Sequence, residues 1–246
     1  MGVVIAVVSG KGGTGKTSVC AGLSVALAAQ GKRVLSIDCD VGLRNLDISL
    51  GLTDSAALSF LDVIEGGYPL AQATVHPLYP SLSFLTAPMN RPVEKIDIPA
   101  FAGFIREARR NFDYILLDAP AGVDAGFRMV CAAADRFLVV TGPGPAAVRD
   151  AARVGELLEL KGKTDVRLVV NRVDKNTLSI LKMTIDDVMD TAGLPLIGLV
   201  MEDSEVTLAA ACSLPLLRFN KRSAAVKAYA KIAKRIQGIP EPITFR

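Results

Sequence analysis

Residues 10–17 read Gly-Lys-Gly-Gly-Thr-Gly-Lys-Thr, which fits the phosphate-loop pattern G-x-x-x-x-G-K-[ST]. Glycines let backbone N–H groups turn toward an anion, and a helix that begins near Lys16 adds the positive end of its dipole. Lys16 supplies a charge for the β and γ phosphates of ATP, and the Thr17 hydroxyl suits Mg²⁺. The alternative is a Gly-rich turn without a ligand. The predicted nucleotide contacts of this loop are Gly10, Lys11, Gly12, Gly13, Thr14, Gly15, Lys16, Thr17 and Ser18.

Three carboxylates follow two apolar segments. Asp118 ends the run Tyr-Ile-Leu-Leu, in the place of a Walker B carboxylate that holds a Mg²⁺-bound water. Asp38 and Asp40 end the sequence SIDCD, where two like charges need a cation or hydrogen-bond donors. Helix caps or an exposed acidic turn are the alternative explanation. We predict that the magnesium-binding residues are Thr17, Asp38 and Asp118.

Strands and helices that alternate along the chain must position these residues. Runs that are apolar at nearly every position predict strands covered on both faces, at 3–8, 33–38, 82–86, 114–118, 137–141, 166–171 and 196–200. Helical patterns lie near 16–30, 58–65, 100–111, 146–160, 184–192, 204–211 and 223–237. The alternation predicts an α/β fold, a doubly wound, mostly parallel sheet with helices on both faces, which binds its ligand at the carboxyl ends of the strands. Loops are expected in the proline-rich stretch 66–99.

The composition narrows the function classes. A net charge of +3 does not by itself imply nucleic acid, and the four cysteines form no C-x-x-C pair, as expected of reduced thiols in a cytoplasmic protein. The N-terminus lacks the basic segment and cleavage site of a signal peptide, and no run reaches the roughly 18 apolar residues of a membrane span. We expect a single domain over residues 1–246, with a short extended tail at 238–246.

Several stretches make the chain similar to the MinD/ParA family of ATPases, P-loop NTPases with a deviant Walker A motif that carries an extra signature lysine. KGGTGKT at 11–17 matches that motif. DVGLRNLD at 40–47 resembles the MinD branch more than the D-x-D-P-Q type sequence of the ParA branch. LDAPAG at 117–122 adds to the resemblance, and its Ala121 stands where iron proteins of the same superfamily need a cluster cysteine, which argues against an iron–sulfur site.

The resemblance implies roles for the matched positions. Lys11 would cross the interface of an ATP-bound homodimer and touch the phosphates of the partner's ATP, and Asp40 would orient the attacking water. Together with Lys16, these two are the predicted catalytic residues. A charge supplied in trans to a phosphoryl-transfer transition state is worth about 10³–10⁵ in rate.

The resemblance also assigns supporting roles around the nucleotide. Asp38 would support the magnesium shell, and Asn171, with Arg172 close by, would contact adenine. Residues 40–47 and 118–124 would be the two switches that sense the γ phosphate.

The implied function is an ATP-dependent dimerising switch that hydrolyses ATP to ADP and phosphate and places the division site by recruiting a division inhibitor. The implied partners are a second copy of the chain, a MinC-like inhibitor and a MinE-like or other activator. The alternative is a ParA-like partition or cargo-positioning ATPase that binds DNA as an ATP dimer, although nucleic acid is the less favoured partner. A scaffold that only binds nucleotide is a third reading, against which the complete set of charged residues argues.

Two departures from the MinD branch concern its contacts. Such proteins usually end in an amphipathic membrane-targeting helix, whereas GIPEPITFR at 238–246 is too short and too broken by proline to form one. Attachment to the inner face of the cell membrane would then need another element. Ala152 replaces an acidic residue in a helix that the family uses for partner binding.

The last predicted helix has a basic face beside an apolar one. A surface helix packed on the sheet, attraction to anionic lipid and nonspecific DNA contact are the three readings. The basic residues are Lys227, Lys231, Lys234 and Arg235, and the apolar ones are Val226, Tyr229, Ala233 and Ile236.

Overall fold

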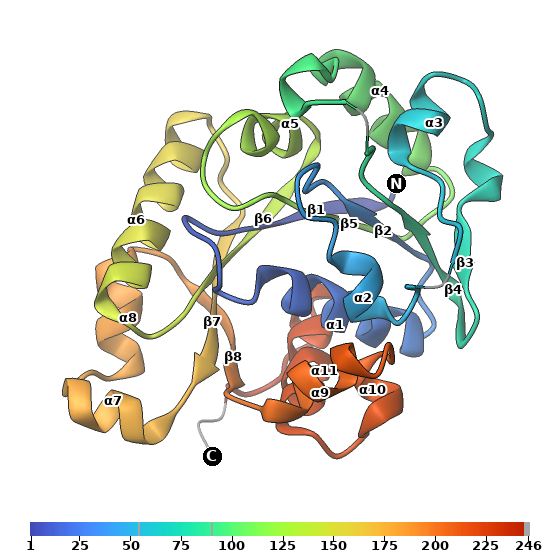
Figure 1. The fold of residues 1–246 in the computed structure, drawn as a ribbon. Helices are drawn as coiled ribbons and strands as arrows, with labels where there is room; N and C mark the ends of the chain where they lie inside the picture. Colours follow the sequence, from blue (N-terminus) through green and yellow to red (C-terminus); the bar gives the residue numbers. More distant parts are fainter. Residues whose placement is uncertain (54, 90, 244–246) are drawn as a thin grey trace.

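The computed structural model describes residues 1–53, 55–89 and 91–243 of the 246-residue chain. Eight strands form one sheet in the order β3-β4-β2-β5-β1-β6-β7-β8 (Figure 1). Neighbouring strands pair in parallel except β3 and β4, which are antiparallel. This arrangement confirms the predicted doubly wound, mostly parallel α/β sheet. The strands are β1 Val3–Val8, β2 Val34–Asp38, β3 Thr74–His76, β4 Tyr79–Leu85, β5 Tyr114–Asp118, β6 Arg136–Thr141, β7 Val166–Val173 and β8 Leu196–Met201.

Helices cover both faces of the sheet. The core on one face includes residues of α1, α2 and α11, and the core on the other includes residues of α3, α4, α5, α6 and α8. In Figure 1, α4 and α5 accordingly lie above the sheet, and α1 and α11 lie below it. The helices are α1 Lys16–Ala29, α2 Leu46–Leu50, α3 Phe60–Ile64, α4 Ile98–Ala108, α5 Ala125–Ala133, α6 Pro145–Leu160, α7 Lys175–Leu181, α8 Ile185–Ala192, α9 Ser204–Ala211, α10 Leu216–Phe219 and α11 Ala224–Ile236.

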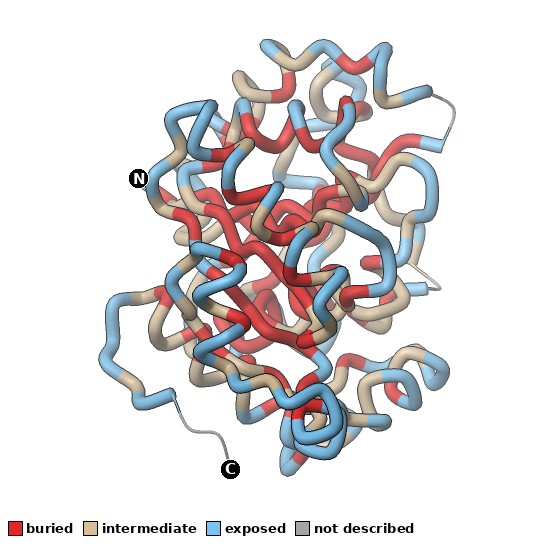
Figure 2. The backbone as a smooth tube through the Cα atoms, turned by 90° about the vertical axis from the view of Figure 1, so that its left-hand side faces the viewer, coloured by how far each residue is buried: buried red, intermediate tan, exposed pale blue. Residues whose placement is uncertain are grey.

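The central strand β1 shows why the apolar runs become strands. Successive side chains of a strand point to opposite faces, and Val4 and Ala6 enter one core while Ile5 and Val7 enter the other. A strand covered on both faces must therefore be apolar at every position. Figure 2 shows the strands as a buried layer beneath more exposed helices and loops.

Several predicted boundaries were wrong. The stretch 66–99 holds a strand pair as well as loops, because β4 begins at Tyr79 rather than Leu82 and pairs with the unpredicted strand β3. The helices α2, α5, α7 and α10 were also missed; each has nine residues or fewer, a length over which a helical period is weak evidence, although α3, α8 and α9 are as short and were predicted. The other predicted elements differ from the observed ones by a few residues at their ends.

The last helix packs as a surface helix. All four residues of its apolar face are buried, as the first reading of this helix expects. Two of the four basic residues bind the segment that follows: Arg235 donates to the carbonyls of Glu241 at 2.8 Å and Pro242 at 2.7 Å, and Lys234 pairs with the Glu241 carboxylate at 3.0 Å. Residues 239–243 adopt neither helix nor strand, and residues 244–246 of the predicted tail lie outside the described residues.

Across the described part of the chain, the helices fall short of the length and apolar character that a membrane crossing requires.

Candidate active site

The loop between β1 and α1 is rich in glycine and open on one side. Gly13 and Gly15 have φ of 81° and 82°, in the left-handed region that glycine adopts without strain. A Cβ at Gly12 or Gly13 would meet no atom within 4 Å, so this side of the loop is free for a ligand. A Cβ at Gly15 would lie 2.2 Å from the Asn171 side-chain nitrogen, so this position needs glycine for space as well as conformation.

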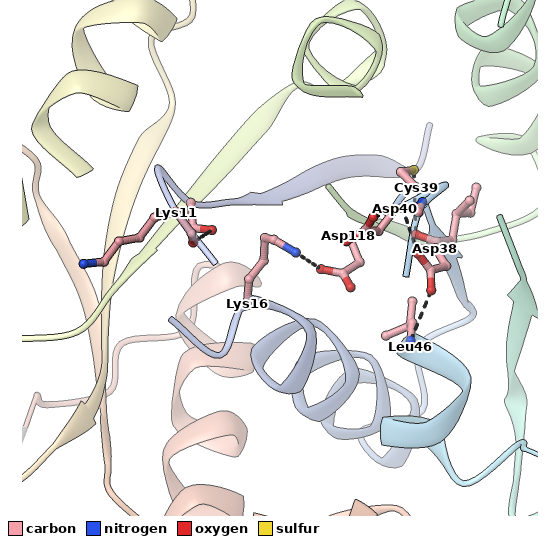
Figure 3. A network of polar contacts seen from close by, with 10 residues as sticks. Lys11, Lys16, Asp38, Cys39, Asp40, Leu46 and Asp118 are labelled. Carbon is pink, nitrogen blue, oxygen red and sulfur yellow. Dashed lines mark hydrogen bonds and ion pairs between the residues drawn. The ribbon is translucent and has the colours of Figure 1, made fainter. Parts of the chain in front are cut away.

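Lys16 and Asp118 form a buried ion pair at the head of α1. The Lys16 ammonium lies 3.1 Å from a carboxylate oxygen of Asp118, and the two side chains are 8% and 1% exposed (Figure 3). Burial raises the pKa of Asp118, and the Lys16 charge and a hydrogen bond with the Thr17 side chain oppose that rise. The predicted phosphate lysine and two predicted magnesium-binding residues therefore lie in contact.

Asp38 lies beside this pair, because β2 and β5 are neighbours and Asp38 is in register with Asp118. Its carboxylate accepts the N–H of Asp40 at 2.9 Å and the N–H of Leu46 at 3.1 Å. Burial, followed by the nearby Asp118 charge, raises the pKa of Asp38 to about 7. Two buried carboxylates with raised pKa values form a place where a bound cation would be favoured.

Asp40 is the more open member of the acidic group. It is half-buried, and its side chain accepts the N–H of Gly42 at 3.3 Å. Asp40 thus begins the loop that leads into α2, while Leu46, the first residue of α2, donates to Asp38. The loop of the predicted first switch is therefore hydrogen-bonded at both ends to the carboxylate of Asp38, a predicted magnesium-binding residue.

The donor set fits Mg²⁺ and a nucleotide phosphate. The described residues hold no group of three or more His, Cys, Asp or Glu side chains that could bind a metal by themselves. Mg²⁺ is usually held by one or two carboxylates plus substrate phosphates and waters, which Asp38, Asp118 and Thr17 can provide. The Thr14 hydroxyl is buried and has no hydrogen-bond partner among the described residues, as expected of a loop that completes its contacts with a ligand.

The two lysines of the loop point in different directions. Lys16 points toward Asp118, whereas Lys11 extends away from that pair (Figure 3). The Lys11 ammonium lies 3.9 Å from the carboxylate of Asp150 on α6, and the two side chains are 46% and 42% exposed. Lys11 is therefore not part of the phosphate site of its own subunit in this structure. The sequence reasoning missed Asp150 as its partner, since no local pattern links the two.

The two predicted adenine contacts, Asn171 and Arg172, lie next to the phosphate loop. The Asn171 side-chain amide donates to the Thr14 carbonyl at 2.8 Å and is buried. Arg172 has a φ of 57° and pairs with Glu202 at 2.9 Å. The structure thus gives Asn171 a loop-supporting contact that the sequence did not predict, and the adenine role of both residues stays a prediction. Ser18, the third residue of α1, is partly buried.

Arg44 is another residue that sequence reasoning did not single out. It has a φ of 48° within the predicted switch, and its guanidinium donates to the Thr86 hydroxyl at 2.9 Å. A non-glycine residue in this conformation is strained, and such strain is often found at switch segments. No sequence pattern indicates a positive φ at an arginine, so this feature could not have been predicted.

Comparison with known proteins gives a consistent result. Residues 5–216 match the CobQ/CobB/MinD/ParA nucleotide binding domain family. The chain is 38% identical to the septum site-determining protein MinD of Synechocystis, over 97% of this chain and 90% of that protein. Its fold matches the Aquifex aeolicus structure described as a MinC:MinD cell division protein complex, with a TM-score of 0.91, 34% identity and coverage of 99% and 98%. It also matches the septum site-determining protein MinD of Pyrococcus horikoshii complexed with Mg-ADP, with a TM-score of 0.84, 28% identity and 96% coverage of each chain.

Proposed function

The chain belongs to the CobQ/CobB/MinD/ParA family of nucleotide-binding proteins, and from this premise we propose that it is a MinD-type ATPase that acts in division-site placement. It hydrolyses ATP to ADP and phosphate and changes its contacts with the state of the nucleotide. Relatives named as septum site-determining proteins, similar over nearly the whole chain, support the cellular task. The geometry of the phosphate loop and its carboxylates supports the chemistry.

The residues of the site divide the work of hydrolysis. The loop amides and Lys16 bind the phosphates and stabilise the charge that spreads over them in the transition state. Mg²⁺, held through Thr17 and the carboxylates of Asp38 and Asp118, neutralises phosphate charge when it is bound. Asp40 is half-buried next to Asp38, where its carboxylate can orient the attacking water.

One observation carries the proposal that the active form is a homodimer. The two lysines of a single loop have different partners: Lys16 contacts Asp118 in the phosphate site, and Lys11 contacts Asp150 outside it. Lys16 is buried in its own site, whereas Lys11 is exposed and its ammonium forms a long ion pair with Asp150. An exposed pair of this kind contributes little stability, so Lys11 can leave it at small cost. A second subunit facing the loop would then receive the Lys11 charge at its own nucleotide.

The description of a related complex favours a protein partner, and the contacts of α11 argue against DNA. The Aquifex aeolicus relative is described in a complex with MinC, which supports a MinC-like inhibitor as a partner of this chain. A MinE-like activator and peripheral binding to the inner face of the membrane from the cytoplasm complete the proposal. The DNA-binding alternative would draw on the basic residues of α11, and two of these, Lys234 and Arg235, are bound to the segment after the helix.

The decisive test is the variant Lys11→Ala. ADP binding, measured by calorimetry, should stay within about twofold of the unmodified protein, because Lys16 and the loop amides remain. ATP-dependent dimerisation, measured by light scattering, should be lost, and turnover should fall by about 10³-fold or more. Lys161→Ala, an exposed lysine after the end of α6, is the matched control and should change none of these. A Lys11→Ala protein that still dimerises and hydrolyses ATP normally would rule out the two-site role of the loop.

A second experiment separates the proposed partners. The protein is sedimented with anionic-lipid vesicles or mixed with duplex DNA, in each case with ATP or ADP. The proposal expects ATP-dependent sedimentation with the vesicles and no ATP-dependent DNA shift at low salt. The opposite pattern would favour the partition-type alternative.

A further inference from the structure

A basic hollow of about 340 Å³ lies between α11 and β8. It forms where the helix packs against β8, which is the last strand at this edge of the sheet (Figure 1). Four cationic side chains line the hollow, and none of its lining residues is acidic within the part of the chain that the structure describes. The four cations are Arg222, Lys227, Lys231 and Arg235.

The sequence concentrates positive charge in this region. Residues 206–240 contain seven basic residues and no acidic one, whereas the whole chain has a net charge of +3, so the rest of the chain carries a net −4. On α11, Lys227, Lys231 and Arg235 recur every four residues, and this spacing places them on one side of the helix. Like charges at this spacing repel one another, so the cluster costs stability in the free protein and is relieved when an anion binds.

Glu241, on the segment after α11, shows that cations outnumber acids here. Its carboxylate pairs with Lys234 at 3.0 Å. The bond with Lys234 lowers the pKa of Glu241 most, and the charges of Lys231 and Arg235 lower it further. One carboxylate therefore faces three cations of the same helix, and the hollow keeps a surplus of positive charge.

Some cations of the hollow are fixed in place and others can move. Arg235 donates to three backbone carbonyls at 2.7–2.8 Å, which hold its guanidinium in place without neutralising its charge. Arg222 and Lys227 are exposed, and neither side chain forms an ion pair within the described part of the chain. The hollow thus combines one preorganised charge with two side chains that can close on an anion.

Apolar side chains distinguish this hollow from a purely polar anion site. Leu199, Met201 and Ile243 line it together with the cations. Ile243 is 43% exposed, and Phe219, shortly before Arg222, is 36% exposed. Nucleic acid binds such a surface mainly through its phosphates, which need cations alone. The interface of an anionic bilayer offers phosphates beside apolar chains, so the mixed lining favours lipid over nucleic acid.

We propose that the basic hollow binds the phosphate groups of anionic lipids and so holds the protein on the surface of a bilayer. The inference rests on the peripheral membrane binding of the proposed function and names the surface, within the folded domain, that makes the contact. Each Lys or Arg close to an anionic bilayer strengthens binding about fivefold. Salt screens these charges, so binding should weaken as the ionic strength rises.

A double variant that removes the two mobile cations tests the site. Binding is measured by sedimentation with ATP and vesicles of phosphatidylcholine that contain about 30% phosphatidylglycerol. Arg222→Ala combined with Lys227→Ala should weaken binding about 25-fold, because two cations leave the contact. Arg106→Ala combined with Lys161→Ala removes the same charge from exposed positions on α4 and after α6, on the opposite face, and should stay within about twofold. Vesicles of phosphatidylcholine alone should not sediment the unmodified protein.

ATP turnover and ATP-dependent dimerisation of the same proteins separate this inference from the proposed function. Both should be unchanged in the two double variants. If the two double variants bind the anionic vesicles equally well, the assignment of this surface is overturned while the proposed function stands. If the unmodified protein hydrolyses ATP but sediments with no vesicle, the inference and the membrane part of the proposed function both fail. Missing turnover with intact vesicle binding that the Arg222 and Lys227 changes weaken would contradict the proposed function alone.

Two further measurements exclude other anions. Inorganic phosphate at about 10 mM, at constant ionic strength, should leave vesicle binding unchanged, because a bilayer engages several cations at once. Duplex DNA should show no shift that depends on Arg222 and Lys227. Release of the protein by phosphate would assign the hollow to a soluble phosphate compound, and a DNA shift that the double variant loses would assign it to nucleic acid. Either result overturns the proposal.

Discussion

Charged side chains are arranged differently at the two ends of the sheet. At the amino ends of the strands, acids and bases form pairs open to solvent, such as Arg33 with Asp113 at 2.8 Å and Arg136 with Asp165 at 2.9 Å. At the carboxyl ends, Asp38 and Asp118 are buried side by side, and one lysine, Lys16, pairs with Asp118. The first end is balanced without any ligand, whereas the second reaches balance only when cations and phosphates join it. The difference shows which end of the same sheet is built for chemistry.

The largest effect is expected when Lys16 is removed from the carboxyl end of the sheet. Lys16→Ala should lower ATP turnover by about 10³-fold or more, because the phosphates lose their nearest charge and Asp118 loses its partner. Turnover is followed by phosphate release, and ADP binding by calorimetry should weaken as well. This separates Lys16→Ala from Lys11→Ala, which should retain ADP. Near-normal turnover in Lys16→Ala would place the chemistry elsewhere.

The second test concerns pH. Because burial raises the pKa of Asp38 to about 7, the folded protein holds a proton that the unfolded chain has already released. The free energy of unfolding should therefore fall as the pH rises from about 4 to about 7, by roughly 2–4 kcal/mol from this group. In urea denaturation of nucleotide-free protein, Asp38→Asn should remove about that much of the pH dependence. Asp113→Asn is the control at the other end, and equal pH profiles for Asp38→Asn and the unmodified protein would contradict the prediction.

A third test uses two glycines of one loop. Gly15→Ala should destabilise the fold by about 1–3 kcal/mol, because its φ of 82° suits glycine and the new methyl would meet the Asn171 amide. Gly12→Ala should stay within about 0.5 kcal/mol of the unmodified protein, since its Cβ meets nothing within 4 Å. Thermal unfolding without nucleotide measures both. Equal losses would mean that the contact with Asn171 does not constrain the loop.

The smallest effect is expected at the balanced end. Arg33→Ala removes a pair whose side chains are 60% and 36% exposed, so the loss of stability should be below about 1 kcal/mol and should shrink further in high salt. Urea denaturation at low and high salt measures it. If Arg33→Ala lowered the free energy of unfolding as much as Gly15→Ala, the surface ion pairs would contribute more stability than this comparison of the two ends of the sheet predicts.

The sequence predicted most where local pattern and burial agree. The runs that became β1, β2 and β5 are mostly apolar because both faces of the sheet are covered, and the carboxyl ends of β2 and β5 bring Asp38 and Asp118 into the same region, as predicted. The phosphate loop was found from spacing alone, because it needs specific residue types within eight positions.

The rest depends on contacts between distant residues, which no local pattern encodes. The ion pair of Lys11 with Asp150, the bond of Asn171 to the Thr14 carbonyl and the basic hollow between α11 and β8 each join separate segments. The strand β3 was missed because it has only three residues and a register shift against β4. Sequence reasoning therefore predicted the fold class and proposed the residues of the site, and the structure added how the loop is supported.

The position of β1 has a consequence for how the chain acquires its fold. This first strand lies in the middle of the sheet between β5 and β6, so Val3 pairs with Tyr114 and Ile5 pairs with Arg136. During synthesis the ribosome releases β1 long before either neighbour exists, and its apolar residues stay unpaired until nearly half of the domain has emerged. Folding should be slow for a chain of this size, because such long-range pairing carries a large loop-closure cost. The nascent chain would depend on chaperones during that interval more than one whose first strand pairs with its second.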